Sequence, residues 1–124
     1  MNIVFRVDSS TELGAGHLIR CITLAHELQK RNHNITFICK KFKGNLINLI
    51  NYKTLELPLN NNSKENSLKI NYINTDQNED AGQTIKVIPK NTDFLIVDCY
   101  SLGEKWHRQL RPYTKKIIVI DDLS

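Results

Sequence analysis

Apolar residues recur along the chain in two patterns: short, nearly unbroken runs and runs with three- or four-residue spacing. The first run, residues 3–7, is interrupted only by Arg6, is rich in β-branched and aromatic side chains, and predicts a strand. From His17 to about Arg31 the apolar positions have helical spacing, which predicts an amphipathic helix packed on a sheet. These positions are Leu18, Cys21, Ile22, Ala25 and Leu28. The chain therefore opens with a strand, a loop and a helix.

The same alternation continues to the end of the sequence. Further strands are predicted at residues 35–39, 54–57, 93–97 and 117–120, and further helices at about 45–50, 79–88 and 103–110. Residues 58–66, rich in Asn, Ser and Lys, predict an exposed loop. Strands that alternate with helices over short loops favour an α/β fold, a Rossmann-like parallel sheet with right-handed crossovers and helices on both faces.

Length and composition limit the chain to one domain and exclude several classes. A chain of 124 residues, 40% of them hydrophobic, can bury one ordinary core. The net charge of +4 comes from scattered lysines and arginines, so nucleic acid is not a predicted partner. No run of about 18 apolar residues predicts a membrane span, and no signal peptide is predicted. Cys21, Cys39 and Cys99 lack a CxxC pair and predict buried thiols of a reducing, cytoplasmic compartment.

Polar clusters follow three of the predicted strands. Residues 8–17 follow the first strand, residues 98–100 follow the strand at 93–97, and Asp121-Asp122 follows the last. Ligands of open parallel sheets gather beyond the carboxyl ends of the strands. The sequence therefore predicts a functional site where these clusters meet.

The first cluster contains a glycine loop followed by a histidine. Gly14 and Gly16 lack the third glycine of a dinucleotide fingerprint, so a NAD site is not predicted. They permit an anionic group to approach the N–H groups at the helix start. The helix dipole there favours a neutral imidazole at His17, the form that a general base requires. Arg20, one turn later on the same face, is expected to steady an anionic substrate.

Plainer interpretations of these residues stay open on the sequence alone. His17 is also a candidate helix cap, Asp98 a candidate turn cap, and Asp121-Asp122 a candidate cap for a following helix. Tyrosines such as Tyr100 more often pack than bind. No cluster of His, Cys and Asp has the spacing of a metal site, and neither GxSxG nor a Walker A sequence occurs, so no metal or cofactor is predicted.

Several spaced motifs give the chain its resemblance to a known family. They are residues 5–10 (FRVDSS), 14–21 (GAGHLIRC) with Leu24-Ala25, Asp80-Ala81 with Thr84, residues 95–100 (LIVDCY) and 120–123 (IDDL), together with Trp106. In this order, and across essentially the whole chain, they resemble the UDP-sugar hydrolases of pseudaminic acid biosynthesis. The resemblance implies hydrolysis of a UDP-linked diacetamido-trideoxy sugar to UDP and free sugar, without a metal.

The resemblance also implies roles for individual residues. His17 would activate the water that attacks the anomeric carbon, with inversion, and Tyr100 would lie beside the sugar and that water. Asp98 would fix the loop that bears Tyr100. Residues that would shape the sugar side of the cleft are Asp8, Gly14 and Gly16. Position 99, often histidine in the family, is Cys99 here, so a polar contact from that side chain is not implied.

A two-domain architecture similar to GT-B glycosyltransferases is the last implication of the resemblance. Residues 1–124 would be its N-terminal Rossmann-like domain, and a C-terminal domain, in cis or in trans, would supply most contacts to UDP. The chain alone is then expected to be inactive or nearly so, as a truncated form or one module of a fused or split enzyme. Two other functions stay open: a GT-B sugar transferase, in which His17 deprotonates an acceptor hydroxyl, and a non-catalytic binding or assembly module.

Overall fold

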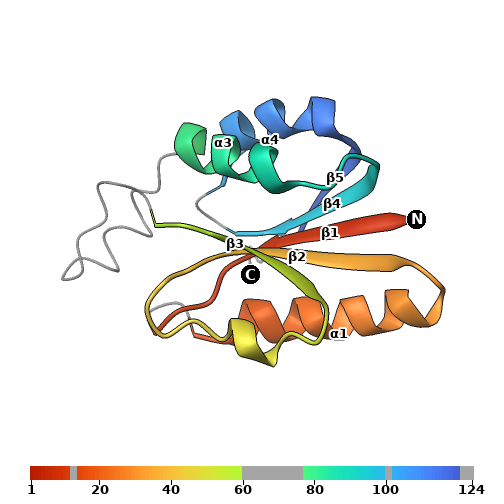
Figure 1. Cartoon of the computed structure of the whole chain (residues 1–124), viewed down its shortest axis with the longest axis vertical. Coiled ribbons are helices and arrows are strands. Elements are labelled where there is room, and N and C mark those ends of the chain that lie inside the picture. Colours follow the sequence, from red (N-terminus) through yellow and green to blue (C-terminus); the bar gives the residue numbers. More distant parts are fainter. Residues whose placement is uncertain (12–13, 60–76, 100–101, 121–124) are drawn as a thin grey trace.

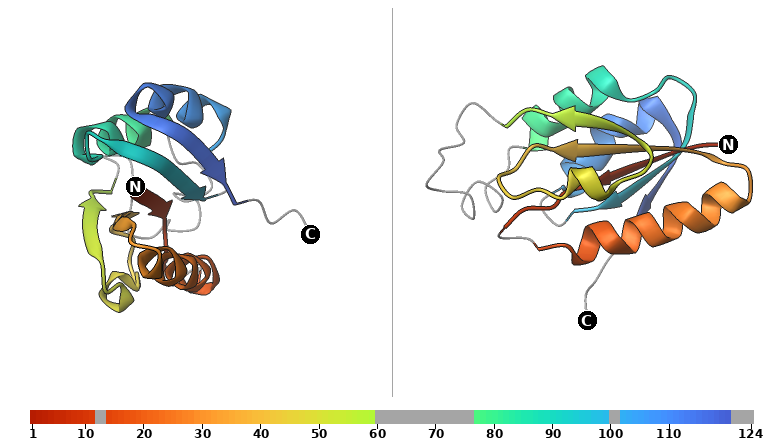
Figure 2. Two further views of the ribbon diagram at one scale, coloured as in Figure 1. Left: turned by 90° about the vertical axis from the view of Figure 1, so that its right-hand side faces the viewer. Right: turned by 60° about the horizontal axis from the view of Figure 1, so that its bottom comes forward.

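A five-stranded parallel sheet is the centre of the fold. The computed structural model describes residues 1–11, 14–59, 77–99 and 102–120 (Figure 1). Within these residues the strand order is β3-β2-β1-β4-β5, with β3 and β5 at the two edges (Figure 2). The strands are β1 (Asn2–Val7), β2 (Asn34–Lys40), β3 (Lys53–Leu57), β4 (Thr92–Asp98) and β5 (Thr114–Val119). The predicted Rossmann-like α/β class is confirmed.

Helices cover both faces of this sheet. Helix α1 (Gly16–Lys30) lies on one face, and α3 (Gln77–Val87) and α4 (Glu104–Leu110) lie on the other (Figure 1). The chain runs outward from β1 to β3 and then crosses back to β4 and β5. Right-handed crossovers in opposite directions place their helices on opposite faces, as predicted. In the part of the chain that the structure describes, none of the helices is long and apolar enough to cross a membrane.

The predicted helix at residues 45–50 is wrong. This segment contains only a 3-10 turn, η1 (Ile47–Leu49). Its first residue, Asn45, donates from its side chain to the carbonyl of Phe42 at 2.8 Å and accepts from the backbone of Ile47 at 3.2 Å. An asparagine that bonds to nearby backbone competes with helix formation. A second 3-10 turn, η3 (Arg111–Tyr113), leads into β5, and most of the predicted loop at 58–66 lies outside the described residues.

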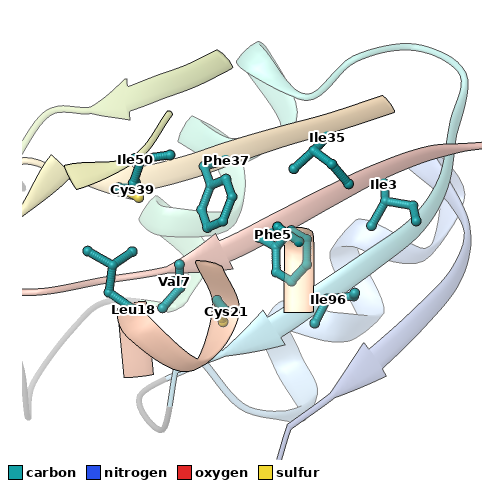
Figure 3. Packing of buried hydrophobic residues seen from close by; sticks show 11 residues of the cluster. Ile3, Phe5, Val7, Leu18, Cys21, Ile35, Phe37, Cys39, Ile50 and Ile96 are labelled. Carbon is teal, nitrogen blue, oxygen red and sulfur yellow. The ribbon is translucent and has the colours of Figure 1, made fainter. Parts of the chain in front are cut away.

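Each face of the sheet buries its own apolar core. On the α1 face, Leu18 and Cys21 pack toward Phe5 and Phe37, whose rings stack with centroids 4.9 Å apart (Figure 3). On the other face, Trp106 of α4 is fully buried in the second core. Because β1 is central and has a core on either side, its side chains from Ile3 onward are buried, as in strands covered on both faces.

The three cysteines differ in burial. Cys21 and Cys39 are buried as predicted, whereas Cys99 is half-buried. Burial, with Asp98 nearby, raises the pKa of Cys21 well above its usual value; burial, with Asp8 nearby, raises the pKa of Cys39 to about 12. The thiolate is the form of cysteine that reacts with alkylating agents.

We therefore expect iodoacetamide to label Cys99 first in the native chain. Cys21 and Cys39 should become reactive only after unfolding in urea, because burial both shields them and suppresses their thiolates. Peptide mass spectrometry of samples quenched over time measures the three rates separately. Equal labelling rates of Cys39 in native and unfolded protein would contradict the burial of that thiol.

Candidate functional site

The carboxyl ends of β1 and β4 lie side by side in the middle of the sheet. Val7 pairs with Asp98 at the end of this ladder. From here the chain leaves β1 toward α1 on one face and leaves β4 toward α4 on the other (Figure 1). Where such connections diverge, an open parallel sheet has a crevice in which ligands bind. The structure therefore puts the candidate site at the junction of β1 and β4.

The loop after β1 is held against the loop after β2. The backbone of Leu46 donates to Ser9 Oγ at 2.8 Å, and the backbone of Thr11 donates to the carbonyl of Lys43 at 3.2 Å. Gly44 approaches so closely that a Cβ there would lie 1.9 Å from Thr11 Oγ1. These contacts fix the path that leads from β1 to the start of α1.

The two glycines of this loop have different structural roles. Gly14 has a φ of 74°, in the left-handed region that favours glycine, and its N–H donates to the carbonyl of Ser10 at 2.8 Å. Gly16 begins α1 outside that region, and a Cβ there would meet no atom of the described chain within 4 Å. Gly14 is thus explained by the backbone turn, while the open space at Gly16 is compatible with its predicted place beside a ligand.

His17 lies in the first turn of α1 with its ring against the end of β4. Its Nδ1 is 2.7 Å from Asp98 Oδ1, and 24% of its side chain is exposed against 1% for Asp98. A carboxylate oxygen at this distance places a proton on Nδ1, because two acceptors cannot share a hydrogen bond without one. The lone pair of the neutral ring is then on Nε2. The same relation between a carboxylate and an imidazole orients the general base of Ser-His-Asp enzymes.

Arg20 and Cys21 approach the same carboxylate from the next turn of α1. Arg20 donates from Nη2 to Asp98 Oδ1 at 2.8 Å and from Nε to Oδ2 at 3.0 Å, and Cys21 Sγ lies 3.5 Å from Oδ2. The sequence predicted Arg20 near the site as a partner of an anionic substrate, and its contact with Asp98 was not predicted. The positions of His17, Arg20 and Cys21, three and four residues apart on one helix face, are the signal that could have suggested a shared contact.

Asp8 points into the protein and is 5% exposed. Its Oδ1 accepts from Arg6 Nη1 and, at 2.8 Å, from the backbone of Lys40, while Cys99 Sγ lies 3.7 Å from Oδ2. The carboxylate therefore joins the ends of β1, β2 and β4. Its placement at the sugar side of a cleft remains a prediction.

A buried charge cluster behind the rim was not predicted. We define it as Arg6, Lys40 and Asp80, all at most 2% exposed. Asp80 Oδ2 accepts from Arg6 Nη2 at 2.7 Å and from Lys40 Nζ at 2.8 Å, and Trp106 Nε1 donates to Oδ1 at 2.9 Å. Burial alone would raise the pKa of Asp80, but the two cations outweigh it and hold that pKa well below its usual range. The sequence signal was Arg6 in the middle of an apolar strand.

Some of the predicted site lies outside the described residues. This holds for Tyr100 and for Asp121-Asp122. Among the residues that are described, no group of three or more His, Cys, Asp and Glu side chains is arranged to hold a metal ion.

Comparison with known proteins gives two matches, and no family model matches the chain. The chain is 30% identical over 122 residues to the uncharacterized protein MJ1062 of Methanocaldococcus jannaschii. This alignment covers 98% of this chain and 22% of that protein. It is 39% identical over 57 residues to the UDP-2,4-diacetamido-2,4,6-trideoxy-beta-L-altropyranose hydrolase of Campylobacter jejuni. This second alignment covers 46% of this chain and 19% of that enzyme. The chain thus matches about a fifth of the length of either relative. Less than half of it is similar to a nucleotide-sugar hydrolase.

Proposed function

We propose that this chain is the catalytic-base domain of a nucleotide-sugar hydrolase. The observation that carries the proposal is the contact between His17 Nδ1 and Asp98 Oδ1 at the junction of β1 and β4. It directs the basic Nε2 of a half-buried imidazole away from the carboxylate at the place where this fold binds ligands. The partial similarity to the Campylobacter hydrolase supports a UDP-linked diacetamido-trideoxy sugar as the substrate.

In the proposed reaction, His17 Nε2 takes a proton from water as the water oxygen attacks the anomeric carbon. The bond between that carbon and the diphosphate oxygen breaks, and UDP leaves with the bonding electron pair. Attack opposite the leaving group inverts the anomeric centre. Asp98 stabilises the imidazolium that forms, because its carboxylate already accepts the Nδ1 proton at 2.7 Å. The imidazolium then returns its proton to solvent.

The proposal gives the other predicted residues positions around this reaction. Gly14 and Gly16 lie on the path into α1 and would line the sugar side of the cleft. Tyr100, two residues after Asp98, would lie beside the sugar and the attacking water. We further propose that a second domain, in cis or in trans, holds the UDP. The chain alone would then orient the sugar poorly and turn over slowly.

Isotope labelling in the absence of an acceptor tests this function. A protein that joins this chain to a nucleotide-binding domain is incubated with the UDP-linked diacetamido-trideoxy sugar in H₂¹⁸O. We expect UDP and free sugar in equal amounts, with no ¹⁸O in the UDP, because the bond from carbon to oxygen breaks. Incorporation of ¹⁸O into UDP would overturn the proposed attack on carbon. Release of sugar only after an acceptor alcohol is added would favour the transferase instead.

A further inference from the structure

We infer that Arg20 and Asp98 form a positioning pair that fixes the tautomer of His17. In this tautomer Nδ1 carries the proton and Nε2 carries the lone pair. The consequence for catalysis rests on the proposed function, but the tautomer is a property of this chain by itself. The inference also changes the predicted role of Arg20 from binding an anionic substrate to holding a carboxylate.

The guanidinium of Arg20 binds both oxygens of the Asp98 carboxylate. Arg20 reaches both carboxylate oxygens, with Nη2 at 2.8 Å and Nε at 3.0 Å. Two parallel charge-assisted bonds fix the plane of a carboxylate as well as its position. With its side chain only 1% exposed, Asp98 has little water to replace these donors. The oxygen that His17 contacts is therefore presented in one orientation.

The alternative tautomer would place two lone pairs against each other. If Nδ1 carried the lone pair, it would accept from Arg20 Nη2, which lies 3.1 Å away. It would also face Asp98 Oδ1 at 2.7 Å with no proton between them. The carboxylate contact is shorter and is charge-assisted, so it decides the tautomer. Arg20 Nη2 and His17 Nδ1 then both donate to the same oxygen.

A guanidinium has a property here that an ammonium lacks. Arginine presents its N–H groups in a rigid planar fork, whereas lysine carries a single charge on a flexible stem. Arg20→Lys keeps the positive charge and the helix but removes the second of the two parallel bonds to Asp98. The carboxylate can then rotate away from His17. This substitution separates the positioning role from simple charge attraction.

Nitrogen NMR of the 124-residue chain tests the inference without any substrate. With ¹⁵N-labelled histidine at about pH 9, where imidazoles are neutral, long-range ring couplings show which nitrogen carries the proton. The His17 signals are assigned by their loss in His17→Gln. We expect the proton on Nδ1 in the wild type. In Arg20→Lys we expect the ratio of the Nδ1–H to the Nε2–H form to fall roughly tenfold, the size of one hydrogen bond to a charged group.

The matched control is Arg31→Lys, the same substitution at an exposed position at the end of the same helix. It should leave the His17 ratio at the wild-type value, and urea unfolding verifies that both variants are folded. A wild-type His17 protonated on Nε2, or an unchanged ratio in Arg20→Lys, would overturn the inference. The two proposals can fail separately. If the proton is on Nδ1 but the protein that joins this chain to a nucleotide-binding domain releases no sugar, the proposed function fails and the positioning pair stands.

Discussion

Replacing Asp80 with asparagine is expected to lower the free energy of unfolding by about 3–5 kcal/mol. Asp80 is fully buried and is the partner of both Arg6 and Lys40, at 2.7 and 2.8 Å. Asparagine has nearly the same shape but no charge, so Arg6 and Lys40 would both lose the carboxylate that they share. Since small domains have a total stability of about 5–15 kcal/mol, this loss would remove a large fraction of it. Urea denaturation monitored by circular dichroism measures it.

Two further variants show whether charge is the cause. Glu104→Gln removes an exposed carboxylate that pairs with Arg108 and should cost less than about 1 kcal/mol. The double variant Lys40→Met with Asp80→Asn removes one charge of each sign, so it should be more stable than Asp80→Asn alone. If the single and double variants were equally unstable, the loss would come from packing around Asp80, and the charge argument would be wrong.

The same carboxylate makes stability depend on pH in a definite direction. Despite its burial, Arg6 and Lys40 keep the pKa of Asp80 below the value of about 3.9 that it has in the unfolded chain. The unfolded state therefore binds more protons, and the stability that Asp80 contributes is present above about pH 4 and lost as pH falls toward its native pKa. Asp80→Asn lacks this group, so its urea midpoint should fall less steeply below about pH 4 than that of the wild type.

Local apolar patterns were sufficient to predict most of the fold. The strand at 3–7 and the helix from His17 to Arg31 were found within about one residue, because strand and helix periodicities are distinct over these lengths. The segment 45–50 failed because its spacing is apolar but its first residue, Asn45, bonds to the neighbouring backbone. Such a short segment has too few positions for periodicity to outweigh one local hydrogen bond.

The site was predictable in its place but not in its contacts. Polar residues after β1 and β4 had to meet because adjacent parallel strands end together, which brings His17 to Asp98 across 81 positions of sequence. The side on which each residue points follows from strand parity. Asp98 contacts His17 on the α1 face, and the next residue, Cys99, points instead toward Asp8. Sequence alone did not fix which of the two neighbours would face the histidine.

The buried charge cluster was hidden from sequence analysis for a different reason. Asp80 and Arg6 are 74 positions apart, Arg6 within an apolar strand and Asp80 directly after Glu79 in a polar stretch. Their pairing depends on α3 lying on the face of the sheet to which Arg6 and Lys40 point, which no local pattern specifies. Buried charges require partners, so Arg6 in a central strand implied a buried acid, but its identity needed the tertiary structure.

In a protein that joins this chain to a nucleotide-binding domain, the proposed role of His17 predicts that His17→Gln reduces turnover by about 10²–10⁴-fold, the usual loss when a general base is removed. At about 1.36 kcal/mol for each factor of ten, this raises the barrier by about 2.7–5.4 kcal/mol. The glutamine amide can still donate to Asp98, which preserves the contact between α1 and β4, but it cannot take a proton from water. Steady-state rates of UDP release, with UDP affinity measured by calorimetry, test the prediction.

The changes in kcat and KM of His17→Gln distinguish a general base from a residue that only binds the substrate. Because the base acts only in the transition state, kcat and kcat/KM should fall together and UDP affinity should not change. His26→Gln, at an exposed position of the same helix, makes the same chemical change away from Asp98 and should leave the rate unaltered. If His17→Gln kept more than about a tenth of wild-type turnover, the loss would be less than about tenfold, which is smaller than the smallest loss expected for a general base. His17 would then be a residue that only positions the substrate, and the attacking water would have to lose its proton to another group.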